Sequence, residues 1–155
     1  MNREILFKAK RIDNGEWVEG FLVRKIDPLL GTNSSFVLKQ EFDKSCIDGK
    51  PTVLKSEMTW YKVTPESVSE FTGLTDKNGK KIFEGDICKF REWSKGDMCW
   101  VGKVHYEYQQ FVISGNPNKE CESPFTLVMS RFVPENIEII GNIHDNPELL
   151  EEKND

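Results

Sequence analysis

The stretch of residues 71–90 constrains the fold of this chain more than any other part of the sequence. It contains a Thr-Gly-Leu step, the tetrapeptide Asp-Lys-Asn-Gly at residues 76–79, and a Glu-Gly-Asp-Ile step that leads into an alternating apolar run. Asn and Gly reach positive φ at little cost, so Asn78-Gly79 predicts a tight turn between two strands. The stretch therefore predicts a β-hairpin followed by the start of a further strand.

Alternating apolar runs and turn signals extend the β prediction in both directions along the chain. Upstream, residues 5–10 and 17–23 are expected to form a hairpin around the turn at Asp13-Asn14-Gly15, with a kink or bulge at Gly20. Further strand candidates are residues 36–38, 52–54, 58–63, 86–90, 98–106, 111–113, 125–129 and 137–143. The polar segments 27–35 and 114–124 predict loops.

Two short segments of similar composition each precede a candidate closing strand: Pro-Glu-Ser-Val at residues 65–68 and Pro-Glu-Asn-Ile at residues 134–137. Pro suits the first position of a helical turn and Glu its positive end, so each segment predicts a one-turn connector. SH3-like small barrels commonly carry such a connector. We therefore expect a mainly β protein with two small β units joined across residues 71–74.

The expected boundaries are residues 1–70 for an N-terminal β unit and residues 71–155 for an SH3-like barrel unit. Asn146 is a suitable N-cap for a terminal helix of about two turns over residues 147–152, and the Leu149-Leu150 pair is expected to dock on the barrel. An acidic tail follows the helix.

The order of the motifs in residues 71–90 resembles the signature of the YopX family, small proteins encoded by bacteriophages and prophages. The opening Arg-Glu-Ile-Leu-Phe-Lys-Ala at residues 3–9 and the closing Ile-Ile-Gly-Asn-Ile-His-Asp-Asn-Pro-Glu-Leu-Leu at residues 139–150 are similar to that family as well. The resemblance implies an all-β protein of phage type with no established activity. It supplies no catalytic residues.

Composition limits the classes of function. With 37% hydrophobic and 11% aromatic residues, the chain is an ordinary globular sequence. Much of its formal charge of −5 comes from residues 145–155, so the rest of the chain is near neutral. There is no signal-peptide pattern and no apolar run long enough for a membrane span, so we expect a protein of the bacterial host cytoplasm without membrane contact.

The cysteines and histidines show no pattern of a metal or catalytic site. Cys46, Cys88, Cys99 and Cys121 are widely spaced, so free thiols and no cofactor are expected in a reducing compartment. Zinc binding by Cys88, Cys99 and His105 would need a spacing that the sequence lacks. The neighbouring side chains of His144 and Asp145 would diverge on an extended chain. We therefore expect no enzymatic activity.

Two kinds of partner remain. Loops and edge strands of small β units favour binding to another protein or self-assembly, with residues 27–35 and 114–124 as candidate recognition loops. The alternative is a nucleic-acid-binding face that combines basic and aromatic side chains. Its candidate residues are Lys80, Lys81, Arg91, Trp93 and Trp100.

Overall fold

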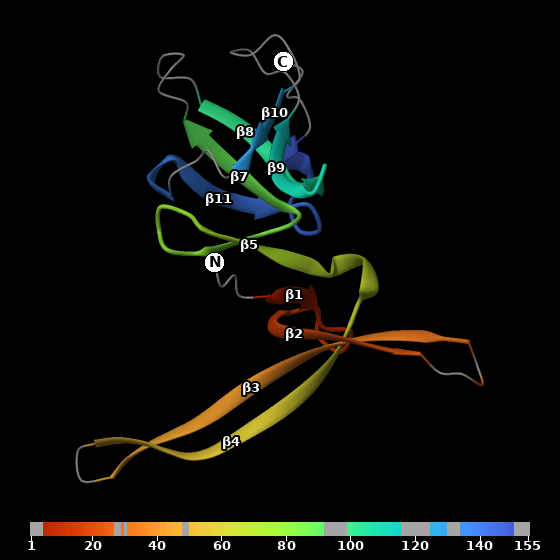
Figure 1. Ribbon diagram of the computed structural model, residues 1–155, viewed down its shortest axis with the longest axis vertical. Coiled ribbons are helices and arrows are strands. Elements are labelled where there is room, and N and C mark those ends of the chain that lie inside the picture. Colours follow the sequence, from red (N-terminus) through yellow and green to blue (C-terminus); the bar gives the residue numbers. More distant parts are fainter. Residues whose placement is uncertain are drawn as a thin grey trace. The chain divides into compact units, whose positions relative to one another are not determined.

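A computed structural model describes the backbone of residues 5–26, 29, 31–47, 50–91, 99–115, 125–129 and 134–150, and the side chains of these residues except 42–47, 50–56, 91, 99 and 134. The chain divides into two compact units, Ile5–Glu70 and Phe71–Asp155. The described elements are antiparallel strands and short 3-10 turns, which confirms the mainly β prediction (Figure 1).

The first sheet has six strands in the order β4-β3-β2-β1-β5-β6; strands β1 to β4 belong to the N-terminal unit, and β5 continues past Glu70 and pairs with β6 Lys81–Phe83. Their bounds are β1 Phe7–Lys10, β2 Trp17–Ile26, β3 Asn33–Ile47, β4 Lys50–Val63 and β5 Ser69–Thr75, with the 3-10 turn η1 at Pro65–Ser67. The predicted first hairpin is present, since Ala9 of β1 lies opposite Val18 of β2. The Pro-Glu connector is present as η1. The expected connection at residues 71–74 is part of β5.

Alternation places one side of these strands in a small core. Ala9, Val18, Val37 and Val63 are buried together. An isolated bridge between Arg11 and Val63 brings the end of β4 back to the end of β1, and Ile12 N donates to Lys62 O at 3.0 Å. A Cβ at Gly20 would lie 2.3 Å from Leu38 O, so a glycine is needed where β2 and β3 approach.

Strands β3 and β4 are much longer than the sequence pattern predicted. Their register continues from the Ser35–Val63 pair to the Ile47–Lys50 pair, and they form a long two-stranded ribbon (Figure 1). Strand β3 includes residues 33–35, which the sequence pattern predicts as part of a loop; of that loop, residues 27, 28 and 30 lie outside the described part. The middle section of β3 is polar. Backbone pairing with β4, and not burial of apolar side chains, therefore extends this strand.

The C-terminal unit contains the five-stranded sheet β10-β9-β8-β7-β11. Its elements are β6 Lys81–Phe83, β7 Asp86–Arg91, β8 Cys99–Glu107, β9 Gln110–Gly115, β10 Phe125–Val128, η3 Pro134–Asn136, β11 Ile137–Asn142 and η4 Pro147–Leu150. All five predicted strands of this unit are present. Within the described ranges no pairing joins the outer strands β10 and β11, so the sheet is open and no closed barrel is formed.

The C-terminal segment differs from its prediction. A single 3-10 turn, η4, occupies residues 147–150 in place of a two-turn helix, and none of its residues is buried. Leu149 nevertheless lies beside Gly141, where an added Cβ would be 2.7 Å from the Leu149 methyl group. Residues 151 and 152 of the predicted helix lie outside the described residues.

Candidate functional site

Asp76 is a buried carboxylate within the stretch that constrains the fold. Its Oδ1 accepts hydrogen bonds from the backbone N–H groups of Asn78 and Lys80, each at 2.9 Å. Its Oδ2 accepts from Ile139 N at 3.2 Å, on strand β11. The side chain therefore shapes the predicted turn, where Gly79 has φ +75°, and holds that turn against the closing strand.

The same contacts set the charge of Asp76. Burial alone would raise the pKa of this carboxyl group, but hydrogen bonds from the backbone N–H groups of Lys80, Ile139 and Asn78 stabilise the charged form. The result is a pKa below the usual 3.8. Asp76 is therefore an anion at neutral pH, fixed by donors that belong to the fold.

Asp86 makes a second connection of the same kind. Its Oδ2 accepts from Phe83 N at 2.8 Å, and its Oδ1 accepts from the side-chain amide of Asn142 at 2.9 Å. Asn142 lies at the end of β11 and accepts from His144 N at 3.0 Å. The two aspartates thus join the hairpin region to β11, and we attribute the Asp-x-Asn-Gly and Glu-Gly-Asp-Ile motifs to folding.

Of the residues predicted for a nucleic-acid face, the three with described side chains, Lys80, Lys81 and Trp100, do not form one exposed surface. Trp100 is only 6% exposed and belongs to the core, with its ring 4.7 Å from that of Phe125 and 6.3 Å from that of Phe90. Alternation along β8 turns residue 100 to the same side as buried Val104. The prediction of Trp100 as an exposed stacking residue is wrong.

The other members of that set differ in position. Lys80 is exposed, whereas Lys81 is half-buried with its ammonium group 5.7 Å from the ring centre of Phe71. Trp93 and the side chain of Arg91 lie outside the described residues. The structure thus places two lysines of the predicted face, whereas the ring of Trp100 is buried and cannot stack on a base.

His105 lies between Ser114 and Glu107, an arrangement with the composition of a catalytic triad. Its Nδ1 is 3.4 Å from Ser114 Oγ and also 3.4 Å from Lys103 O, and its Nε2 is 3.3 Å from Glu107 Oε2. Each ring nitrogen faces an acceptor, Lys103 O at Nδ1 and a Glu107 carboxylate oxygen at Nε2, so these contacts do not select one tautomer. All three distances are longer than the roughly 2.6–3.2 Å that is typical of a nucleophile hydrogen-bonded to its base.

The residues considered for zinc binding differ in their exposure. Cys88 is fully buried in the core, whereas His105 is partly exposed on β8. The side chain of Cys99 lies outside the described residues. Over the ranges that the structure describes, no group of three or more metal-ligating side chains comes together.

A pocket of about 300 Å³ lies in the C-terminal unit beside the turn that Asp76 shapes. It is lined by Lys77, Lys89, Phe90, Glu135, Asn136, Ile137 and Glu138. Lys77 Nζ lies 2.7 Å from Glu138 Oε2, so a salt bridge already neutralises part of this lining. The mixed charges favour neither an anionic nor a cationic ligand.

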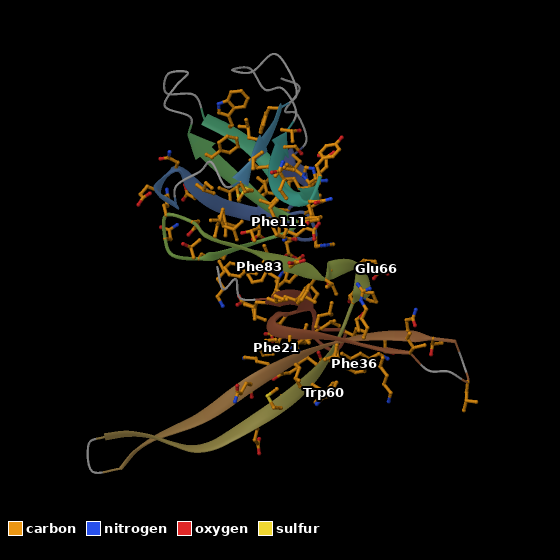
Figure 2. The ribbon with its side chains drawn as sticks, viewed as in Figure 1. Phe21, Phe36, Trp60, Glu66, Phe83 and Phe111 are labelled. Atoms are coloured by element: carbon orange, nitrogen blue, oxygen red, sulfur yellow. The ribbon has the colours of Figure 1, made fainter. Side chains whose placement is uncertain are left out.

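The most distinctive surface of the described residues is an exposed apolar area on strands β2, β3 and β4. We call it the aromatic face and define it by six residues: Phe21, Val23, Phe36, Leu38, Met58 and Trp60. The strand register aligns Phe21, Leu38 and Trp60 in one row across the three strands. Figure 2 shows Phe21, Phe36 and Trp60 gathered where these strands run side by side.

The aromatic face is open to solvent. Trp60 is 57% exposed, Phe21 51% and Met58 47%. The rings of Phe36 and Trp60 meet edge to face with centroids 6.0 Å apart. Large contiguous apolar areas are uncommon on the surfaces of monomeric soluble proteins and usually mark interaction sites.

Strand β4 also offers an open edge beside this face. Lys62 O accepts from Ile12, so the backbone groups of Lys62 point away from β3. Residues 60 and 58 have the same orientation because the orientation repeats every second residue. Among the described residues no strand pairs with them on that side.

The sequence contains a signal for the aromatic face beyond the alternating pattern of the strands. Residues 21–23 and 36–38 are each three consecutive apolar residues. A strand with one buried side needs apolar residues only at alternate positions, so an uninterrupted run indicates that both sides contact something. Val37 is buried in the core, and Leu22, which is half-buried, lies opposite it, so both side chains are on the core side and Phe21, Val23, Phe36 and Leu38 are on the other side.

The fold and the site define a mainly β protein with an exposed aromatic sheet face. The motifs of residues 71–90 stabilise its fold. The chain belongs to the YopX family: the family model described as YopX protein matches residues 31–151. The chain is also similar to a solved structure, protein EF1440 from Enterococcus faecalis, at 23% identity and a TM-score of 0.53. The alignment covers 97% of this chain and 100% of that one.

At that identity the similarity to the solved structure concerns the fold alone. No curated protein matches the chain. Nor do the described residues include a helix with the length and apolar character needed to cross a membrane.

Proposed function

We propose that this protein is a non-enzymatic accessory protein of phage or prophage type that acts in the host cytoplasm by binding another protein, including further copies of itself. The observation that supports the proposal best is the aromatic face. Aromatic residues and Met are enriched at the centres of protein interfaces, where charged residues are depleted. The six residues that define the face carry no charge.

The expected energy of contact is consistent with an interface centre. Full burial of an aromatic or large aliphatic side chain contributes about 1.5–3 kcal/mol relative to exposure. Trp60, Phe21 and Met58 are each roughly half exposed, so their complete burial would add about 3 kcal/mol in total before the cost of association. Such a contribution corresponds to a change of about a hundredfold in affinity.

We further propose that the C-terminal unit is related to SH3-like small barrels. The order β10-β9-β8-β7-β11 and the 3-10 turn η3 immediately before the closing strand support this assignment. In such folds the sheet is a scaffold, and recognition depends on surface residues rather than on the fold class.

The test compares a face variant with a matched control. Phe21→Ala combined with Trp60→Ala removes two exposed rings from the face, whereas Tyr108→Ala removes a ring that is 84% exposed in the other unit. Molar mass is measured by sedimentation over a range of concentrations, and tagged protein is used to recover partners from phage-infected cells with and without nuclease. We expect association or nuclease-resistant recovery that the face variant loses and the control keeps.

The nucleic-acid alternative gives a different result in the same experiment. Recovery of partners would be sensitive to nuclease, and DNA binding would weaken with salt and with Ala at Lys80, Lys81 and Arg91. Equal behaviour of the face variant and the Tyr108→Ala control in every measurement would contradict the proposed function.

A further inference from the structure

The exterior of the N-terminal unit carries an uneven charge around the aromatic face. Cross-strand pairs place five charged residues on the same side of the strands as Phe21: Lys8, Lys10, Lys25, Lys62 and Glu19. Four of these are basic and one is acidic. Two copies that met face to face would bring lysines together, so the charge favours an acidic partner segment.

Two of the lysines lie at one end of the face. Phe36 of β3 is opposite both Val23 and Lys62, and Lys25 follows two residues after Val23 on the same side of β2. Both lysines are exposed. A segment that covers Phe36 and Trp60 would therefore have two ammonium groups within reach of its carboxylates.

The C-terminal segment of this chain has the complementary chemistry. Residues 145–155 read Asp-Asn-Pro-Glu-Leu-Leu-Glu-Glu-Lys-Asn-Asp, five acidic residues against one lysine, with two leucines at the centre. The part that the structure describes, residues 145–150 with the turn η4, has no buried residue, and Leu149 is 38% exposed. The leucines offer apolar surface for the aromatic face, and the acids flank them on both sides.

We propose that the aromatic face binds the acidic C-terminal segment of a second copy, with Leu149 and Leu150 against Phe21 and Trp60 and the flanking acids near Lys25 and Lys62. This inference rests on the protein-binding function proposed above and names its partner. The contact is heterologous, since two different surfaces meet. Heterologous contacts build rings or open chains of subunits rather than closed two-fold dimers.

Binding of a labelled synthetic peptide of residues 145–155 to the full-length protein tests the proposal by fluorescence anisotropy. We expect saturable binding that weakens as salt rises, because exposed charges are screened. Lys25→Glu with Lys62→Glu should weaken binding about tenfold, whereas the control Lys89→Glu with Lys103→Glu in the other unit, the same change of charge, should not.

A charge exchange separates a specific contact from general attraction. A peptide with Lys in place of Glu148, Glu151 and Glu152 should bind the Lys25→Glu, Lys62→Glu variant more tightly than it binds the wild type. Absence of peptide binding, or an equal loss in the control variant, would overturn the proposal. If the peptide fails while Phe21→Ala with Trp60→Ala still abolishes association, the proposed function stands and only this partner is wrong.

Discussion

Replacement of Asp76 should lower the stability of the C-terminal unit more than replacement of an exposed charged residue does. In Asp76→Ala three backbone N–H donors lose a charged acceptor, and each hydrogen bond to a charged group contributes about 1.5–3 kcal/mol. Water can replace the acceptor for the two donors in the turn, but the Ile139 donor is partly buried. We therefore expect a loss of about 3 kcal/mol rather than the sum over all three bonds.

The substitution Asp76→Asn removes the charge of the side chain and keeps its shape. Its amide oxygen can keep the bonds to Asn78 and Lys80, but its NH₂ group would face the N–H of Ile139. The expected loss is about half that of Asp76→Ala. Asp13→Ala is the matched control, because Asp13 is an exposed carboxylate paired with Arg11 at 3.0 Å.

Urea unfolding followed by tryptophan fluorescence measures these losses. Trp17→Phe and Trp60→Phe in the background leave Trp100 as a core reporter of the C-terminal unit, with Trp93 in the same unit. A midpoint shift for Asp76→Ala that is no larger than the shift for Asp13→Ala would contradict a stabilising role of the Asp76 hydrogen bonds.

The pH dependence supplies an independent check. The folded pKa of Asp76 lies below its usual value, so its contribution to stability is present above about pH 4 and is lost as pH falls through the folded pKa. The stability difference between wild type and Asp76→Ala should therefore be constant near neutrality and shrink in acid. A difference that grew as the pH fell would contradict the assignment.

Three other variants test the fold. Gly20→Ala should cost about 2 kcal/mol in thermal unfolding, because its Cβ would meet Leu38 O, and an unchanged midpoint would show that the strands separate easily. Trp100→Ala should cost about 3–5 kcal/mol, whereas a surface ring would cost little. Tyr108 and Gln109 both have positive φ, so Tyr108→Asn with Gln109→Gly should raise stability by about 1–2 kcal/mol; a decrease would mean that the tyrosine packs usefully.

Local turn chemistry made the hairpins predictable from sequence. Asn78-Gly79 and Asp13-Asn14-Gly15 lie at turns between paired strands, since the backbone preference of these residues does not depend on the rest of the protein. The Pro-Glu segments became 3-10 turns for the same reason.

Features that depend on distant partners were predicted less well. The ribbon of β3 and β4 is extended by backbone pairing, which leaves no apolar alternation in the sequence. Trp100 was predicted to be a surface ring because it lies near basic and other aromatic residues in the sequence, but its position in β8 directs its side chain into the core. Prediction of the aromatic face requires knowledge of which side of β2 and β3 is buried. That side is decided by the positions of Ala9 and Val63, which are distant in the sequence.

The hydrogen bonds of Asp76 and Asp86 set the order in which the protein can fold during synthesis. They join residues 63 and 56 positions apart in the chain, and both end on β11, which is synthesised after the other described strands. The buried carboxylates have only part of their donors until β11 arrives, and contacts of such sequence separation form slowly. The unit Ile5–Glu70 needs no residue beyond position 70 for its own core, so it can fold while the C-terminal unit is still being made.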